Sequence, residues 1–426
     1  MEKPKAKPGD YVEVHLSKII YEGVLLETPG SEKGIVLLKL DSGYNIGFNK
    51  KDILEIKFKR KISESKKDFE IKKSPEKPNI AMIITGGTIA SRYDSKTGGA
   101  SNLTKPEDLF KYYPDVFKHA NIVKVEIPFM KSSEDMDFRD WQKIAKTAEK
   151  LLNDSNIKGI IITHGTDTLH YTSAALSFFL RNLQKPVVLT YSQRSIDRAS
   201  SDANLNLQCA ALMAVSDFAE VMIVGHGTNN DDFCYAMPGT KVRKMHTSRR
   251  DAFKTINAGP FAKVFPNRIE IISAHNKSNG GKTKIDAKFE DKIALIKIHP
   301  GEKPDVLDYY VKNKFKGIVL ETTGLGHVPS NGKNSWLSKL KEIQRKGIIV
   351  CATAQTIYGR LDPYVYSNGR KLLETGVIFL EDMLSETAFV KLGWVLGHSE
   401  WAKNKEIVRE KMLENFSREL NPRLEE

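Results

Sequence analysis

The 426-residue sequence contains few cysteines and no long hydrophobic run. Its three cysteines, Cys209, Cys234 and Cys351, are widely separated and form no CxxC pair. We therefore expect no disulfide framework and interpret all three as small buried hydrophobic residues. No apolar segment is long enough to cross a bilayer, and the first residues lack the pattern of a signal peptide. Together these absences predict a cytoplasmic protein.

Motifs for nucleotide and metal chemistry are also missing. There is no P-loop, and the segment Gly324-Leu325-Gly326-His327 lacks the longer dinucleotide fingerprint, so we interpret it as a turn. The histidines are scattered, and no pair has the spacing of a zinc site with a third ligand. We therefore predict no metal site and no cofactor in this chain.

Positive charge is in excess, with 66 lysines and arginines against 53 acidic residues and a net charge of +13. A basic surface suits an acidic partner such as RNA, although composition alone does not establish nucleic-acid binding. The hydrophobic content of 40% is typical of a globular protein, and the length exceeds that of a single compact core. We expect two or three domains.

Residues 1–57 differ in pattern from the rest of the chain. Val12, Val14 and Leu16 alternate with polar residues, and further short apolar runs follow between turn signals. Short strands at this spacing predict a small SH3-like β-barrel, with a docking or positioning role because it carries no catalytic cluster. Residues 58–78 are rich in lysine and proline, which indicates a basic linker, either a solvated spacer or an RNA contact.

From residue 79 onward, apolar strands alternate with helical segments, a pattern that predicts parallel sheets covered by helices. We predict a catalytic α/β domain over 79–275, a polar linker over 276–289 and a smaller α/β domain over 290–426. The predicted strands of the catalytic domain are 80–85, 159–163, 187–191 and 221–225. Those of the smaller domain are 293–298, 317–320 and 348–352.

Two short motifs follow predicted strands of the catalytic domain. They are Thr85-Gly86-Gly87-Thr88-Ile89-Ala90 and His164-Gly165-Thr166-Asp167-Thr168. Ligands of open α/β sheets bind at the carboxyl ends of the strands, and glycines there let a substrate approach the main chain. Either motif alone is more often a turn or a helix cap than an active site. Both on one sheet predict an amidase with a hydroxyl nucleophile, which needs an adjacent base and oxyanion donors.

On these motifs the chain resembles the bacterial-type asparaginase/glutaminase superfamily from about residue 79 to its end. Within that superfamily it is most similar to the D subunits of archaeal glutamyl-tRNA(Gln) amidotransferases. The extra β module before the first motif supports this closer resemblance, as do Ser192-Gln193-Arg194-Ser195 and Ser200-Ser201-Asp202-Ala203. The resemblance implies an asparaginase-like α/β fold for both larger domains.

The resemblance also implies a set of catalytic residues. Thr88 matches the first catalytic threonine, the acyl acceptor, while Thr166 and Asp167 match the second threonine and its aspartate. The family's lysine follows a glycine by five positions, which points to Lys244, with Lys241 as the rival. A lysine that loses its proton can serve as the base.

The family's substrate-binding Ser-Gln-Asp string corresponds here to Ser133, Glu134 and Asp135. By resemblance Ser133 binds the substrate carboxylate and Asp167 its α-amino group. Glu134 replaces a glutamine of the asparaginases, which puts plain asparaginase activity in doubt. The asparaginase loop tyrosine has no clear counterpart, and Tyr93 is the weak candidate.

The resemblance implies a glutaminase subunit that supplies ammonia for converting Glu-tRNA(Gln) into Gln-tRNA(Gln). The implied partner is a GatE-like subunit that uses ATP and magnesium, with tRNA(Gln) bound directly or through that partner. A homodimer within a heterotetramer is implied as well. Two alternatives remain open: a free-standing L-asparaginase with an accessory domain, and a non-catalytic scaffold that binds RNA.

Overall fold

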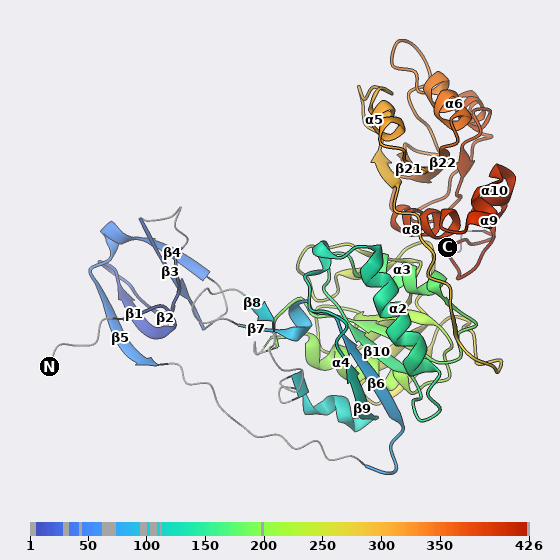
Figure 1. Ribbon diagram of the computed structural model, residues 1–426. Coiled ribbons are helices and arrows are strands. Elements are labelled where there is room, and N and C mark those ends of the chain that lie inside the picture. The colour runs from blue at the N-terminus through green and yellow to red at the C-terminus, as the bar shows by residue number, and fades with distance from the viewer. Residues whose placement is uncertain are drawn as a thin grey trace.

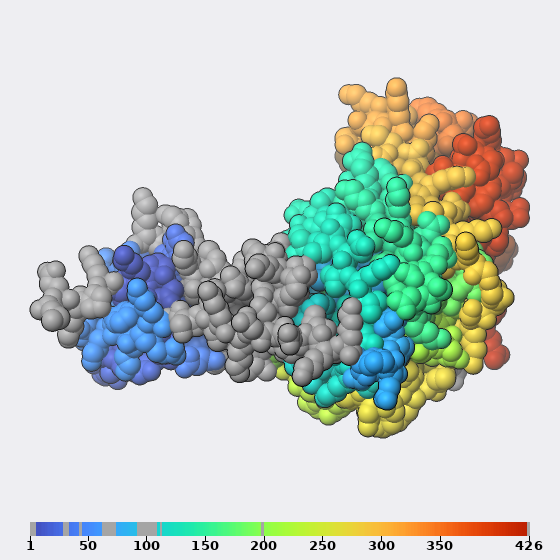
Figure 2. Space-filling model, turned by 60° about the horizontal axis from the view of Figure 1, so that its bottom comes forward, coloured from blue at the N-terminus to red at the C-terminus, as the bar shows by residue number. Residues whose placement is uncertain are grey.

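The computed structural model describes residues 6–28, 34–41, 45–61, 74–93, 100–102, 109–110, 113–196 and 200–423. These residues form a five-stranded sheet near the N-terminus, a central α/β body and a second α/β unit (Figure 1). The five-stranded sheet stands apart from the body, whereas the second unit packs directly on it (Figure 2). Of the helices in these described ranges, none combines the length and the apolar character that a bilayer span requires.

The N-terminal sheet is antiparallel, with the strand order β4-β3-β2-β1-β5. Its strands are β1 (Asp10–His15), β2 (Ile20–Leu25), β3 (Ile35–Lys39), β4 (Asn45–Asn49) and β5 (Glu55–Lys61). Alternate residues such as Val12, Val14 and Leu38 point into one small apolar core. β4 and β5 form opposite edges and share no ladder within the described residues, so the predicted closed barrel is corrected to an open sheet. Closure depends on strand tilt and stagger, which the alternation of apolar residues does not encode.

The central body contains an eight-stranded sheet with the order β18-β17-β14-β13-β12-β10-β6-β9. Its parallel strands are β6 (Asn79–Ile84), β9 (Asn121–Glu126), β10 (Ile160–Thr163), β12 (Val187–Thr190) and β13 (Val221–His226). Its antiparallel strands are β14 (Cys234–Pro238), β17 (Ala262–Phe265) and β18 (Arg268–Ile271). The strands predicted within residues 79–275 coincide with four of the parallel ones.

This sheet is mixed, and the prediction of a parallel sheet holds only for its β9-to-β13 half. The connection from β13 to β14 spans residues 227–233, and that from β17 to β18 spans residues 266–267. A parallel crossover needs about a dozen or more residues, so such short connections force antiparallel pairing.

Helices cover both faces of the central sheet. α2 (Phe138–Leu152) and α3 (Leu169–Phe179) share a core with Ile160 and Ile162, whereas α4 (Ala203–Ala214) shares the opposite core with Ile161. Because successive residues of a strand point to opposite faces, the continuous apolar run of β10 is buried on both sides.

The second α/β unit has a four-stranded sheet that is fully parallel, as predicted, although only three of its strands were predicted. Its strands are β20 (Ile293–Lys297), β21 (Gly317–Thr322), β22 (Ile349–Ala354) and β23 (Ile378–Phe379). Its helices are α5 (Val306–Lys312), α6 (Leu337–Arg345), α7 (Ser367–Leu373), α8 (Ser385–Leu396), α9 (Ser399–Ala402) and α10 (Lys405–Leu413). α8 belongs to the same apolar core as α2 and α3, which joins this unit to the central body.

Three two-stranded sheets complete the described structure. They are β7 (Ser91–Tyr93) with β8 (Ala100–Asn102), β11 (Leu180–Arg181) with β19 (Lys284–Ile285), and β15 (Val242–Lys244) with β16 (Phe253–Thr255). The β7–β8 hairpin projects from the central body toward the N-terminal sheet (Figure 1).

A buried ion pair attaches the C-terminal tail to α8. Lys391 Nζ lies 2.6 Å from Glu419 Oε1, and both side chains have no exposed surface. The ammonium also donates to the Met412 carbonyl, and the carboxylate accepts the backbone N–H groups of Phe416 and Ser417. Burying two charges is tolerated here because each is paired and hydrogen-bonded.

Replacing Glu419 with alanine should lower the free energy of unfolding by about 3–5 kcal/mol, because Lys391 would stay buried without a carboxylate. Equilibrium unfolding in urea measures this loss. The control is Glu342→Ala, which removes partly exposed pairs with Lys339 and Lys346 and should cost less than about 1 kcal/mol. Equal losses in the two variants would contradict a structural role for the buried pair.

Candidate active site

Three turns meet at the carboxyl edge of the parallel strands. Residues 85–88 follow β6, residues 131–135 come after β9, and residues 164–168 follow β10. The backbone N–H of Thr85 donates to the Thr163 carbonyl at 3.2 Å, and that of Lys131 donates to the Thr85 carbonyl at 3.0 Å. The sheet register therefore brings both sequence motifs to one place.

Two glycines allow the backbones of these turns to touch. A Cβ atom on Gly87 would lie 2.4 Å from the backbone nitrogen of Gly165, and one on Gly86 would lie 2.3 Å from the Lys131 carbonyl oxygen. Gly86 and Gly87 also have φ angles of +119° and +81°, which favour glycine. The Gly87–Gly165 contact places the residues that follow it, Thr88 and Thr166, on adjoining turns.

The predicted lysine joins the second motif. Lys244, at the end of β15, places its Nζ 2.8 Å from Thr166 Oγ1 and 2.7 Å from Asp167 Oδ1. The Lys244 side chain is only 12% exposed, whereas that of Asp167 is 62% exposed. The rival Lys241 lies elsewhere, fully buried and 2.7 Å from Asp382. The structure thus brings Lys244, and not Lys241, to Thr166.

Ser133 lies buried against the second motif. Its Oγ accepts the backbone N–H groups of Asp167 at 3.2 Å and Thr168 at 3.4 Å, and its carbonyl accepts the Thr168 hydroxyl at 2.7 Å. The Ser133 hydroxyl proton is therefore left to donate to a ligand. Glu134 and Asp135, next in the same short turn η5 (Ser133–Asp135), are exposed to solvent.

Thr88 opens the turn η3 (Thr88–Ala90) and is partly buried. Within the part of the chain that the structure describes, no group hydrogen-bonds to its hydroxyl, which leaves this oxygen available to react. Tyr93 lies in β7, but its side chain falls outside the described residues. Its role stays a prediction.

A buried histidine supports the second turn. His164 Nδ1 lies 2.7 Å from the Gly165 carbonyl, so it donates there, and Nε2 accepts the Thr172 hydroxyl at 2.9 Å. Burial lowers the pKa of His164 to about 4, so the ring is neutral at pH 7. It holds the turn in place without adding charge to the site.

Two ion pairs from the second α/β unit hold the strand that carries Lys244. Arg243 Nε lies 3.0 Å from Glu386 Oε1 at the start of α8, and Lys241 pairs with Asp382 in the preceding loop. Burial raises the pKa of Glu386, and the positive charge of Arg243 opposes that rise. These pairs were not predicted from the sequence. The only available signal was acidic residues within an otherwise apolar stretch, 377–390.

Comparison with known proteins places this site in a family. Residues 79–277 match the N-terminal domain of asparaginase, residues 292–410 match the glutaminase/asparaginase C-terminal domain, and residues 6–58 match the GatD N-terminal domain. The D subunit of the glutamyl-tRNA(Gln) amidotransferase of Thermococcus kodakarensis is 47% identical over 99% of this chain and 96% of its own length. That of Pyrococcus furiosus is 46% identical over 97% of this chain and 95% of its own. The chain belongs to the GatD family of glutamyl-tRNA(Gln) amidotransferase subunits.

Solved structures of L-asparaginases share the fold of this chain. The thermostable L-asparaginase from Thermococcus kodakarensis superimposes with a TM-score of 0.71 at 32% identity, covering 81% of this chain and all of that one. L-asparaginase I from Vibrio cholerae gives a TM-score of 0.68 at 27% identity, covering 81% and 99%. The chain is thus an amidohydrolase-type subunit, and the family match includes an N-terminal module that lies outside the two asparaginase domains.

In this GatD family member, Glu386→Gln should lower kcat for amide hydrolysis roughly tenfold with little change in KM. The loss of about 1.4 kcal/mol would arise because Arg243 loses its carboxylate and Lys244 shifts from Thr166. Steady-state ammonia release measures both constants. Glu386→Asp should recover part of kcat, and exposed Glu374→Gln should behave like wild type. An unchanged kcat in Glu386→Gln would contradict the positioning role.

Proposed function

We propose that this chain hydrolyses glutamine and supplies ammonia to a partner subunit that converts Glu-tRNA(Gln) into Gln-tRNA(Gln). The observation that carries the proposal is the contact of Lys244 with Thr166 and Asp167 beside the turn that holds Thr88. The similarity to GatD proteins over nearly the whole chain favours glutamine and tRNA-dependent amidation over a free-standing asparaginase.

In the proposed reaction, Thr88 Oγ1 attacks the carboxamide carbon of glutamine and forms an ester to the enzyme. Lys244 and Thr166, 2.8 Å apart, are close enough to pass the hydroxyl proton to the departing nitrogen, which leaves as ammonia. Water then hydrolyses the ester to glutamate. Backbone N–H groups of the glycine-rich turns serve as oxyanion donors, each worth about 3–4 kcal/mol in comparable sites.

Substrate binding in this proposal uses the two ends of glutamine separately. The free hydroxyl proton of Ser133 donates to the α-carboxylate, and the exposed Asp167 carboxylate pairs with the α-ammonium. Glu134 and Asp135 extend the negative charge beside Asp167, because Ser133 bonds directly to the Asp167 backbone. Such a rim attracts the ammonium end of an amino acid.

We also propose that this chain works in an assembly with a partner subunit and tRNA(Gln). By its family, this chain acts in the cytoplasm as a homodimer within a heterotetramer, with a GatE-like subunit that uses ATP and magnesium. We propose no metal or cofactor for this chain itself. tRNA(Gln) contacts the assembly directly through this chain or through the partner, and the N-terminal sheet serves docking or positioning.

Thr88→Ala and Lys244→Ala should each lower glutamine hydrolysis by at least about a thousandfold while leaving assembly with the partner intact. The first variant lacks the attacking oxygen, and the second lacks the proton-transferring group. Ammonia release and size-exclusion chromatography measure the two properties. Lys146→Ala, on the exposed face of α2, is the control and should keep full activity. Full activity in both site variants would contradict the assignment.

The coupled function is tested by ammonia release from glutamine and from asparagine. Each substrate is measured with the chain alone, with the partner, and with the partner plus Glu-tRNA(Gln). We expect the chain alone to release little ammonia. Ammonia release should rise with glutamine as substrate, and only when the partner and Glu-tRNA(Gln) are both present. Strong partner-independent hydrolysis of asparagine would instead identify a free-standing asparaginase. RNA binding without hydrolysis under any condition would identify a scaffold.

A further inference from the structure

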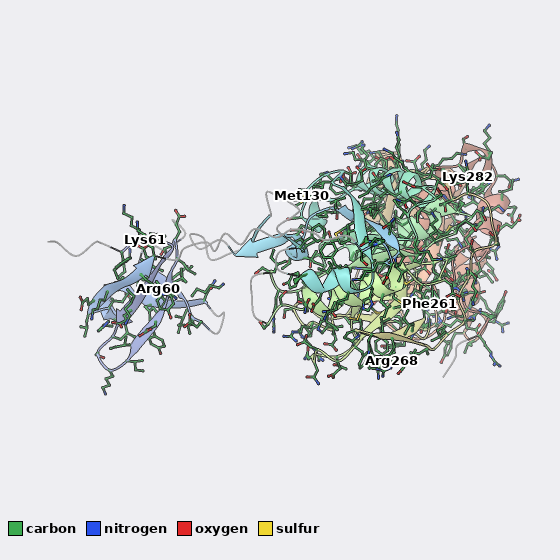
Figure 3. All side chains as sticks on the ribbon, turned by 90° about the horizontal axis from the view of Figure 1, so that it is seen from below. Arg60, Lys61, Met130, Phe261, Arg268 and Lys282 are labelled. Carbon is green, nitrogen blue, oxygen red and sulfur yellow. The ribbon has the colours of Figure 1, made fainter. Side chains whose placement is uncertain are left out.

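A cavity of about 360 Å³ lies on the side of the central body away from the active-site turns. Its wall includes Val221 at the amino end of β13 and Gly239 just after β14. Phe261, also in its wall, lies farther from the N-terminal sheet than Met130, which precedes one active-site turn (Figure 3). The C-terminal tail contributes Phe416 and Ser417 to the cavity wall.

Arg181, at the end of β11, lines this cavity and holds a partly buried charge. Its guanidinium lies 5.1 Å from the ring centre of Phe416 and 5.8 Å from that of Trp394. Within the described ranges of the chain, this guanidinium has neither a hydrogen bond nor an ion pair. Burial lowers the pKa of Arg181, which reflects the lost hydration of its charge. A partly buried guanidinium with no acceptor among the described residues keeps N–H donors that can bind an anion.

Carboxylates near Arg181 contact other side chains. Glu419 pairs with Lys391, Asp286 lies 2.9 Å from His398, and Glu414 lies 2.7 Å from Lys411. The arginine is therefore surrounded by negative charge at a distance, but no carboxylate in the described structure reaches it.

The other charges of the cavity wall are neutralised in pairs. Glu220 lies 3.0 Å from Arg418 and also accepts the backbone N–H of Asn276. Lys277 lies 2.7 Å from Asp217. Among the described lining residues, Arg181 is thus the cation left for a ligand, and the cavity volume matches a small molecule.

The cavity wall continues into the strand of the catalytic lysine. The backbone N–H of Gly239 donates to the Val221 carbonyl at 3.1 Å, and the Thr240 hydroxyl donates to the Ser417 carbonyl at 2.7 Å. A Cβ on Gly239 would lie 2.8 Å from Ser177 Oγ, so this segment packs closely against α3. β15 begins two residues after Thr240 and ends at Lys244.

We propose that this cavity binds a small oxyanion, a carboxylate or a phosphate, through Arg181. A bound anion would hold Ser417 and the Gly239–Thr240 segment in one arrangement. Because that segment leads into β15, occupancy would change the position of Lys244 and hence the turnover of the active site. The site is separate from the proposed glutaminase chemistry, and its binding can be measured without catalysis.

Isothermal titration calorimetry of the full chain tests the site with inorganic phosphate and with succinate in separate arms. We expect saturable binding of at least one anion. The anion that binds more tightly, phosphate or succinate, shows whether the site prefers a phosphate or a carboxylate. Arg181→Met keeps an apolar stem between the two rings and should weaken that binding at least tenfold. Arg181→Lys keeps the charge and should weaken it less. If one of these two variants lacks a cooperative thermal unfolding transition, and so is not folded, the anion affinity of the other variant tests the role of Arg181.

The matched control is Arg268→Met. Arg268 also lies over an aromatic ring, 3.6 Å from the centre of Phe265, but it pairs with Glu270, and neither Arg268 nor Glu270 lines the cavity. This control should bind the anion like wild type. Absence of binding in wild type, or equal binding in Arg181→Met, would overturn the site and leave the glutaminase proposal untouched.

At saturating anion, ammonia release should change at least twofold in wild type and not in Arg181→Met. An unchanged rate would overturn the coupling to Lys244.

Discussion

The backbone contact between Gly87 and Gly165 is the constraint on which the candidate active site depends. Two turns that follow neighbouring parallel strands can approach this closely only when Gly87 carries no side chain, and a Cβ on Gly165 would instead meet Ser133 Oγ at 2.8 Å. Any Cβ on Gly87 would overlap the next turn and force the strand ends apart. The positive φ angles of Gly86 and Gly87, which glycine adopts readily, therefore allow the turns that carry Thr88 and Thr166 to adjoin.

The position of Lys244 depends on a second set of interactions, which come from the other α/β unit. Two basic residues of the same short segment pair with acidic residues of this unit: Lys241 with Asp382 in the loop before α8, and Arg243 with Glu386 at the start of α8. α8 in turn packs on α3, whose first turn directly follows the Thr166 motif. The lysine and the threonine that it contacts are thus positioned through one shared core. Buried charges are costly when unpaired, so these pairs fix one arrangement strongly even if they add little net stability.

Local features of the sequence predicted most of the elements that carry the site. Continuous apolar runs ending in Thr-Gly-Gly-Thr and His-Gly-Thr-Asp identified β6, β10 and the turns after them, because a strand buried on both faces leaves that pattern. The mixed character of the sheet, the open N-terminal sheet and the Arg243–Glu386 pair were not predicted. Strand direction depends on connection length, closure depends on tilt, and that pair joins residues far apart in the chain. The assignment of Lys244 came from resemblance, since the family's spacing after a glycine pointed to it and left Lys241 as the rival.

The distribution of charge around the site explains how a basic protein can favour an amino-acid substrate. The chain carries a net charge of +13, yet the exposed side chains beside the second motif are Glu134, Asp135 and Asp167. Only Lys244 contacts this group among the described residues, and it is mostly buried. The field at the rim is therefore negative where the α-ammonium of a free amino acid would arrive, while excess positive charge lies elsewhere on the chain. Screening has a range of about 8 Å at physiological ionic strength, so the charges of this rim, rather than the net charge of the chain, set the field that an arriving ammonium meets.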